Sequence, residues 1–238
     1  MKERDTIVAA FSEMVQRYET QMNSELNRFW GWSYDEFVSM LLKNVPIKSD
    51  DAILDVATGT SFVPAHLLKN YPNLKHIVGL DITLEMLLKG KQKNLTSFNG
   101  GMIELVCGTA MAMPLASASF NIVLCALATH HMDVKDLLTE IYRLLKPHGK
   151  LAIGDVGGAQ SWKNPIVRFL IRMLAFIYFF FTENKSRAWI EASALTNIRT
   201  VQEWQALLLE LGFNDIAVSE VQSKKLWVPN PLIIIAKK

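Results

Sequence analysis

The stretch ILDVATGTS, residues 53–61, decides the fold and points to a site. Its apolar run ends in Asp55 and passes directly into small residues that include one glycine, Gly59. Such a run predicts a buried strand, and the small residues predict a tight turn whose backbone faces a ligand. Because open α/β sheets bind ligands beyond the carboxyl ends of their strands, this turn is the first candidate site.

Further apolar runs recur along the chain, separated by helix-like segments. The expected strands, each apolar enough to be buried on both faces of a parallel sheet, are 52–57, 76–82, 102–107, 120–127 and 150–156. Segments 83–94 and 133–146 have apolar residues at helical spacing, and Pro147 and Gly149 are expected to end the second. This alternation predicts right-handed crossovers and a three-layer α/β sandwich.

Both ends of the chain depart from this alternation. Residues 1–50 look helical, with apolar stripes over 11–22 and 34–45. A helix is expected over 201–212, and the last two apolar runs are 217–221 and 232–237. Since no helix fits between these two runs, we expect them to pair antiparallel.

Composition excludes several classes of protein. The 238 residues are 50% hydrophobic with a net charge of +2, which predicts a packed globular protein and no nucleic-acid partner. Cys107 and Cys125 lie inside apolar runs, so we expect buried thiols in a reducing compartment. No paired Cys/His spacing occurs, and we expect no metal.

The most hydrophobic segment, 166–181, is shorter than the roughly 20 residues that a membrane-spanning helix needs. It also carries Arg168 and Arg172, so we expect a helix that does not span a membrane. The N-terminus lacks the long apolar core of a signal peptide. These observations favour a cytoplasmic protein.

A second acid narrows the choice of ligand. Asp81 ends the second strand, where a carboxylate can accept two hydrogen bonds from a ribose diol. The turn after Asp55 has neither G-x-G-x-x-G nor a phosphate-binding lysine, which indicates a nucleoside without a pyrophosphate. S-adenosylmethionine is therefore the main candidate. Ser61 is expected to cap the following helix, whose first turn tolerates Pro64.

Six segments resemble, in order, motifs of the class I S-adenosylmethionine-dependent methyltransferases, most of all the ubiquinone/menaquinone biosynthesis C-methyltransferase-like subgroup. They are FSEMVQRYE (11–19), DVATGTS (55–61), LDITLEML (80–87), VCGTAMAMPLASASFNIV (106–123), ATHHMD (128–133) and RLLKPHGKLAIGDV (143–156). The resemblance implies a Rossmann-like methyltransferase fold, an α/β three-layer sandwich with a seven-stranded, mostly parallel sheet. Its implied strand order is 3-2-1-4-5-7-6, with the last strand antiparallel, in one methyltransferase domain over 1–238.

Four positions depart from the family pattern, and one of them, Asn121 in place of the acid after Phe120, is expected to be structural. Ala57 and Ser61 stand where the D-x-G-x-G-x-G turn has its outer glycines. Alanine fits the first position if its φ is below zero, whereas Ser61 is expected to narrow the space under the nucleoside. Thr109 stands where the family has an acid that receives the adenine amino group, and its hydroxyl accepts more weakly.

The resemblance also implies which residues bind the cofactor, S-adenosyl-L-methionine, and its product, S-adenosyl-L-homocysteine. Backbone at the turn would hold the methionine part, Asp81 the ribose, and residues after the second and third strands the adenine. The full set of cofactor-binding candidates is Tyr18, Asp55, Ala57, Thr58, Gly59, Asp81, Ile82, Met86, Thr109 and Ala110. Structural roles stay open: Asp55 as a turn cap, Asp81 as a helix N-cap, and Tyr18 as an exposed helix position.

His130 and His131 follow the fourth strand, near where the resemblance implies that the methyl group is delivered. A histidine there can take a phenol or enol proton at neutral pH, which makes both catalytic candidates. The alternative is that one of the pair only packs or orients a loop. Methyl transfer from a sulfonium needs mainly in-line placement in a dry, apolar site, so it implies no obligatory base.

An aromatic insertion covers residues 157–199, and we expect it to form a helical lid that makes a lipophilic substrate pocket. Its aromatic residues are Trp162, Phe169, Phe176, Tyr178, Phe179, Phe180, Phe181 and Trp189. Arg168 and Arg172 share a helix face, where they would meet an anionic substrate, lipid headgroups or only solvent. Peripheral membrane contact through 166–181 is part of this expectation.

The sequence thus predicts an enzyme that moves a methyl group to carbon or oxygen of a hydrophobic small molecule, such as a quinone precursor, a phenol or a polyketide. Two alternatives remain: an enzyme of this fold with other chemistry, such as a cyclase, and a non-catalytic binding domain. Turnover of S-adenosylmethionine distinguishes the first two, and a cofactor site that binds nothing would favour the third.

Overall fold

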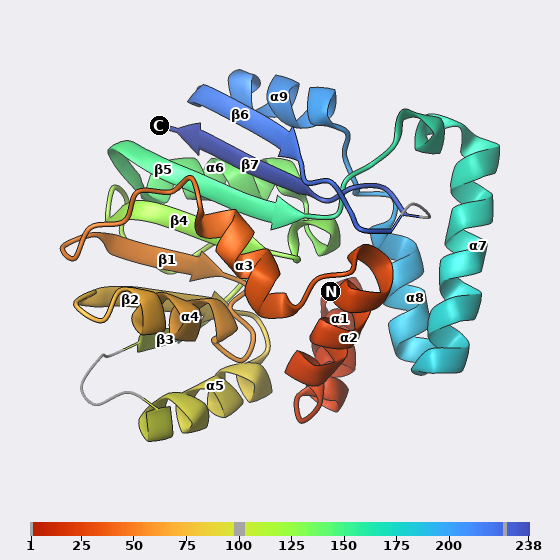
Figure 1. Ribbon diagram of the computed structural model, residues 1–238, viewed down its shortest axis with the longest axis horizontal. Coiled ribbons are helices and arrows are strands. Elements are labelled where there is room, and N and C mark those ends of the chain that lie inside the picture. The colour runs from red at the N-terminus through yellow and green to blue at the C-terminus, as the bar shows by residue number, and fades with distance from the viewer. Residues whose placement is uncertain (1, 98–102, 226–227) are drawn as a thin grey trace.

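The computed structural model describes residues 2–97, 103–225 and 228–238. Its centre is a seven-stranded sheet in the order β3-β2-β1-β4-β5-β7-β6, with helices on both faces (Figure 1). The first five strands run parallel, and β7 pairs antiparallel with both β5 and β6. This confirms the predicted α/β fold class, the strand order and the antiparallel pairing at the end of the chain.

The strands are β1 (Ala52–Val56), β2 (His76–Asp81), β3 (Ile103–Cys107), β4 (Phe120–Ala126), β5 (Leu145–Asp155), β6 (Asn214–Glu220) and β7 (Leu232–Lys237). The α-helices are α1 (Lys2–Met14), α2 (Tyr18–Trp30), α3 (Tyr34–Leu42), α4 (Phe62–Asn70), α5 (Leu84–Ser97), α6 (Val134–Leu144), α7 (Pro165–Thr182), α8 (Lys185–Ala194) and α9 (Val201–Glu210). Two 3-10 helices are η1 (Thr129–His131) and η2 (Gln160–Lys163).

Alternating side chains of the strands build two hydrophobic layers. Ile53 of β1 joins the layer that α2, α3 and α4 cover, which includes the fully buried Phe37. Its neighbour Leu54 points to the other face and joins the layer of α6 and α9, which includes Trp204. Because both faces are covered, the strands read as continuous apolar runs in the sequence.

Several sequence-based boundaries were wrong. The stripe over 11–22 is not one helix, because α1 ends at Met14 and a turn at residues 15–17 separates it from α2. The fifth strand begins at Leu145, so Pro147 and Gly149 lie within it rather than ending a helix. Cys107 is exposed, and only Cys125 is buried as expected. In the third predicted strand, Met102 lies outside the described residues.

Helices of the N-terminal segment and of the insertion at 157–199 meet beyond the carboxyl ends of the parallel strands (Figure 1). There α1 and α2 lie beside α8, and α7 forms the outer edge of the molecule. Tyr178 of α7 accepts a 2.8 Å hydrogen bond from Arg28 of α2, which ties the insertion to the N-terminal segment. Together these helices cover the edge of the sheet at which the predicted site residues lie.

Candidate active site

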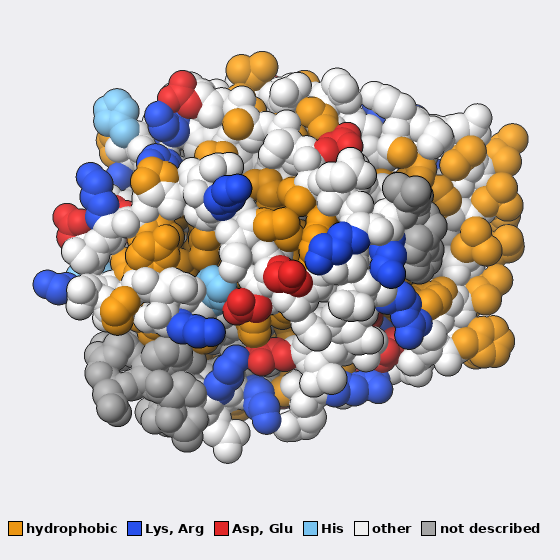
Figure 2. All heavy atoms as spheres, viewed as in Figure 1, with side chains coloured by type: hydrophobic (Ala, Val, Ile, Leu, Met, Phe, Trp, Pro, Cys, Tyr) orange, Lys and Arg blue, Asp and Glu red, His pale blue; other side chains and the backbone are white. Residues whose placement is uncertain are grey.

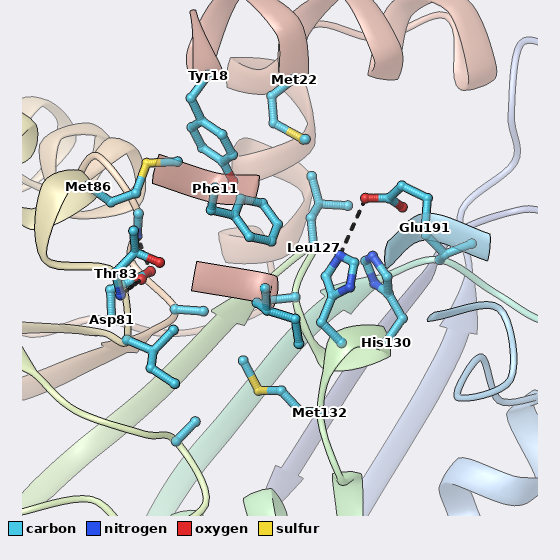
Figure 3. A pocket seen from close by; sticks show the side chains of 18 of the residues that line it. Phe11, Tyr18, Met22, Asp81, Thr83, Met86, Leu127, His130, Met132 and Glu191 are labelled. Carbon is cyan, nitrogen blue, oxygen red and sulfur yellow. Dashed lines mark hydrogen bonds and ion pairs between the residues drawn. The ribbon is translucent and has the colours of Figure 1, made fainter. Parts of the chain in front are cut away.

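A cavity of about 570 Å³ lies at the carboxyl ends of β1 to β5. Figure 3 shows Asp81, Thr83 and Met86 on one side of it and His130 and Glu191 on the other, with Phe11, Tyr18 and Met22 of α1 and α2 above them. We call these sides the aspartate end and the histidine end. Cavities of this size hold small organic ligands.

The turn after β1 forms the floor of the aspartate end. Ala57, Gly59 and Ser61 all have left-handed backbone, with φ of 58°, 54° and 62°. The expectation that alanine fits because its φ is below zero was therefore wrong for Ala57. A left-handed conformation costs a non-glycine residue about 1–2 kcal/mol, so Ala57 and Ser61 hold the turn under strain. The N–H of Thr58 donates to Leu80 O at 3.0 Å and fixes the turn to β2.

Asp81 is the polar centre of the aspartate end. Its Oδ2 accepts from the Gly59 N–H at 2.9 Å, and its Oδ1 accepts from the Thr83 N–H at 2.8 Å. Burial raises the pKa of Asp81 above its usual value, although these two N–H groups oppose the shift. Asp81 lines the cavity, and its carboxylate oxygens are acceptors of the kind that a ribose diol requires.

Asp55, Thr58 and Ser61 lie behind the turn, and their side chains do not line the cavity. Burial raises the pKa of Asp55 to about 7, and its Oδ2 has no hydrogen-bond partner among the described residues. Ser61 makes no side-chain cap to α4, contrary to the prediction, and its buried Oγ faces Gly90 of α5. Ser61 therefore does not contribute to the lining of the cavity.

The remaining cofactor candidates line the same end of the cavity: Tyr18, Ile82, Met86, Thr109 and Ala110. Tyr18 lies over the turn, where a Cβ added to Gly59 would be 3.4 Å from its Cε1. The hydroxyl of Thr109 accepts a long 3.4 Å hydrogen bond from the Met111 N–H, so it is only weakly engaged within the protein.

His130 is held rigidly by Asp155, the acid that ends β5. Its Nδ1 lies 2.7 Å from Asp155 Oδ1, and its backbone N–H donates to Asp155 Oδ2 at 3.1 Å. Burial lowers the pKa of His130, but the Asp155 carboxylate outweighs it and holds that pKa above its usual value. The Thr129 hydroxyl also donates to Asp155. The arrangement holds His130 in a fixed position beside the Asp155 carboxylate.

His131 has the opposite environment. Burial and the neighbouring His130 charge hold its pKa below its usual value, so it is neutral at pH 7. Its Nε2 lies 3.5 Å from Glu191 Oε1 of α8. Its ring meets the Phe11 ring edge to face, with centroids 5.6 Å apart. A neutral, buried imidazole beside a carboxylate is suited to accept a proton.

Arg187 of α8 balances the acids of the histidine end. Its guanidinium is 2.9 Å from Glu191 and 3.6 Å from Glu25 of α2, and the residue is only 4% exposed. Burial raises the pKa of Glu191, but Arg187 outweighs it and keeps the carboxyl ionised. The Nε donor of Arg187 is buried and has no partner in the part of the chain described.

His130, His131 and Glu191 offer ligand atoms within 4.8 Å of one another, a grouping that the Cys/His spacing could not reveal. Asp155 already engages Nδ1 of His130, and the Arg187 cation already neutralises Glu191. These contacts make the group a hydrogen-bonded and ionic network.

Sequence reasoning missed the residues that α2, α5 and α8 bring to the cavity: Met22, Glu25, Thr83, Arg187 and Glu191. In the sequence they look like ordinary positions on amphipathic helices. Asp155 was also missed, although it had a signal, since it ends a buried strand as Asp55 and Asp81 do. Of the predicted aromatic lid residues, Phe179 lines the cavity, whereas Phe169, Phe180 and Phe181 face outward.

Comparison with known proteins gives a consistent result. A family model described as a methyltransferase domain matches residues 54–153. The ubiquinone/menaquinone biosynthesis C-methyltransferase UbiE of Geotalea daltonii is 30% identical over 215 residues, which cover 89% of each chain.

Solved structures show the same fold at lower identity. A SAM-dependent methyltransferase from Aquifex aeolicus superposes with a TM-score of 0.63 at 19% identity, over 95% of this chain and 97% of that one. The [4+2]-cyclase SpnF superposes with a TM-score of 0.66 at 14% identity, over 88% of this chain and 85% of that one. At such identities the likeness establishes the fold alone.

Proposed function

We infer the reaction of this chain from its family: it belongs to the class I S-adenosylmethionine-dependent methyltransferases, with ubiquinone/menaquinone biosynthesis C-methyltransferases among its relatives. It is an enzyme whose methyl donor is S-adenosyl-L-methionine and whose second product is S-adenosyl-L-homocysteine. We propose that the acceptor is a carbon or oxygen of a lipophilic small molecule with an oxygen substituent, such as a reduced quinone or a phenol.

The aspartate end fits the cofactor. Asp81 lines the cavity, where its carboxylate can accept hydrogen bonds from the ribose, and the buried Asp55 supports the turn from behind. We assign Ala57, Thr58 and Gly59 to the methionine part, and Ile82, Met86, Thr109 and Ala110 to the adenine. Tyr18 closes over the bound molecule. When bound, S-adenosylmethionine supplies an electrophilic methyl group on a sulfonium.

The histidine end fits an oxygenated, mostly apolar acceptor. Arg187 and Glu191 line this end of the cavity as a polar pair for a substrate oxygen, and Phe11, Met132 and Phe179 offer apolar contact to the rest. The cavity of about 570 Å³ between the two ends would hold a donor and an acceptor side by side. Such placement supplies most of the catalysis that methyl transfer needs.

His131 is the proposed proton acceptor, and His130 positions it. As the methyl carbon leaves sulfur and bonds to the acceptor, the acceptor loses one proton, from its hydroxyl or from the methylated carbon. The neutral His131 imidazole takes that proton, and the adjacent Glu191 carboxylate stabilises the imidazolium. The observation that carries this assignment is the contrast between His130, paired with Asp155, which raises its pKa, and His131, whose pKa is lowered by burial and by His130.

Turnover tests the proposal. The protein is incubated with S-adenosylmethionine carrying a deuterated methyl group and a panel of reduced quinones and phenols with alkyl or isoprenoid tails. We expect labelled product, whose methyl carbon shift in NMR distinguishes a C-methyl from an O-methyl compound. Formation of no labelled product with any acceptor, while S-adenosylhomocysteine still binds, would refute this acceptor class.

His131→Gln isolates the proton acceptor, because glutamine retains a donor toward Glu191. We expect kcat to fall by about 10²–10⁴-fold, the contribution of a general base, with the Kd for S-adenosylhomocysteine unchanged. His76→Gln, at the exposed start of β2, is the control. An unchanged kcat would assign His131 to packing alone.

The location of the enzyme follows as part of the proposal. The free cysteines Cys107 and Cys125 support a location in the reducing cytoplasm. The N-terminal helices and the insertion at 157–199 are then parts of one methyltransferase domain, acting as the roof and the lid over its substrate.

A further inference from the structure

The outer face of α7 is a continuous apolar stripe. Its exposed residues recur every three or four positions, as one side of a helix requires: Ile166, Phe169, Leu170, Met173, Leu174, Ile177, Phe180 and Phe181. Phe181 is 80% exposed and Ile166 69% exposed. Figure 2 shows these hydrophobic side chains along one edge of the molecule, with Lys and Arg side chains beside them. Soluble surfaces seldom expose an apolar patch of this extent without a function.

The inner face of the same helix is fixed to the protein. Tyr178 bonds with Arg28 of α2, Phe179 lines the cavity, and Nε of Arg172 donates to Ala192 O of α8 at 3.1 Å. The helix is long and apolar enough to cross a membrane by length and composition, yet these polar contacts on one side suit a helix that lies flat. Arg172 is half-buried, with its Nε bonded to α8, whereas Arg168 is exposed.

Charge indicates what the stripe meets. Residues 157–182 contain no acid, and of their three basic residues Arg168 is exposed beside the stripe, whereas Lys163 pairs with Glu203 at 3.1 Å and Nε of Arg172 bonds α8. The nearest acid, Glu183, has a side chain only 3% exposed and is paired with Arg17 at 3.0 Å. On α8, Trp189 is 61% exposed and Lys185 is exposed next to the end of α7. An apolar stripe with basic residues and an exposed tryptophan at its margin is the composition of an interfacial helix on anionic lipid.

The shape of the region agrees. A single convex helix at the edge of the molecule, about 27 Å long at 1.5 Å per residue, offers a ridge rather than a groove for a protein partner (Figure 1). A flat, deformable apolar layer fits such a ridge along its whole length. Moreover, Phe179 connects the inner face of this ridge directly to the cavity.

We propose that α7 seats the protein in the plane of an anionic lipid bilayer, with its outer stripe in the acyl-chain boundary. The seating places the histidine end of the cavity one helix away from the lipid in which a lipophilic acceptor dissolves. That second consequence rests on the proposed function, whereas the seating itself does not. A measurement of membrane binding therefore tests the seating alone, and a measurement of methyl transfer tests the proposed function alone.

Vesicle flotation tests the seating with the full chain. Wild type is mixed with phosphatidylcholine vesicles, with or without 30% phosphatidylglycerol (roughly the anionic content that attracts basic segments). A double variant, Phe169→Glu with Phe181→Glu, places two charges in the stripe. The matched control, Leu88→Glu with Leu209→Glu, changes two other exposed leucines, on α5 and α9. Circular dichroism and binding of S-adenosylhomocysteine verify that each variant is folded.

We expect wild type and the control to float with the anionic vesicles, and the stripe variant to bind at least tenfold more weakly. High salt and the neutral vesicles should each weaken the binding of wild type. Equal flotation of wild type and stripe variant, or no flotation of wild type, would overturn the proposal. A different result would assign the stripe to a second copy of the chain. In that case wild type would elute as a dimer in size-exclusion chromatography and would not float with vesicles, and the stripe variant would elute as a monomer.

Discussion

The aspartate end and the histidine end of one cavity hold polar groups by different means. At the aspartate end, the acid is Asp81, the last residue of β2. Its carboxylate accepts from backbone N–H groups, one of them in the strained turn after β1. At the histidine end, charged side chains from α2 and α8 are buried against one another. The acid at the end of a strand, Asp155 of β5, here bonds only His130 and its neighbours. The first end is fixed by local chain geometry, whereas the second depends on long-range packing of helices.

This difference predicts different sensitivities. Substitutions at the histidine end should damage folding as well as catalysis, because they leave buried charges unpaired. Those at the aspartate end should act mainly on ligand affinity. The following variants test that contrast, from the largest expected effect to the smallest.

Arg187→Met should cause the greatest loss of stability. It leaves Glu25 and Glu191 buried without their cation, which costs about 3–5 kcal/mol of unfolding free energy. Lys135→Met is the control, since its pair with Glu210 is more than half exposed on both sides and should be worth about 1 kcal/mol or less. Urea unfolding measures both. Equal losses would mean that the histidine end is no more dependent on buried charge than the surface is.

Asp81→Ala should instead reduce ligand affinity. Loss of hydrogen bonds to a charged group costs about 1.5–3 kcal/mol, so the Kd for S-adenosylhomocysteine should rise roughly ten- to a hundredfold in calorimetry. Asp51→Ala removes a buried carboxylate that accepts from the Lys48 N–H at 2.8 Å, away from the cavity, and serves as control. A Kd unaltered by Asp81→Ala would remove this residue from the cofactor site.

The two histidines should titrate on opposite sides of the usual histidine pKa near 6.5, His130 above and His131 below. A raised folded-state pKa contributes stability that is complete below the unfolded pKa and is lost as pH rises through the folded value. The stability difference between wild type and His130→Gln should therefore shrink as pH rises above about 6.5.

Activity should rise with pH through a value below 6.5, as His131 becomes neutral. NMR titration in which both rings titrate together would contradict this assignment.

Ser61→Gly should give the smallest effect, a gain. Glycine removes the strain of the left-handed backbone, and it removes a buried Oγ that has no partner among the described residues. Part of this gain in stability is offset, because glycine gives the unfolded chain more conformational freedom. We expect a net stabilisation of about 1 kcal/mol in thermal unfolding. Ala118→Gly shares the positive φ but is exposed, and should gain less. A loss on Ser61→Gly would show that the contact with Gly90 outweighs the strain.

The sequence was informative where the chain determines structure locally. Apolar runs buried on both faces predicted the strands, and the strand-end acids Asp55 and Asp81 marked the edge of the sheet that forms the cavity. The resemblance then implied the strand order, which the structure confirms. The left-handed φ values of Ala57 and Ser61 explain why glycine is the family's residue at both positions.

The histidine end could not be predicted in this way. Glu25, Arg187 and Glu191 are charged residues on short helices, which the sequence pattern assigns to a solvated face. Only the meeting of α2 with α8 buries them, and that contact joins residues more than 150 positions apart. The aromatic residues of α7 misled for the same reason, because composition alone does not tell which side of a helix faces the protein.

The most direct test of the account is thermal unfolding of the wild-type protein with and without S-adenosylhomocysteine. At about a hundred times its Kd, a bound ligand adds roughly 2.7 kcal/mol, which for a chain of this size raises the midpoint by about 5–10 °C. We predict such a shift, because Asp81 and the turn after β1 form a preorganised site. No shift at millimolar ligand would contradict the assignment of the aspartate end to the cofactor.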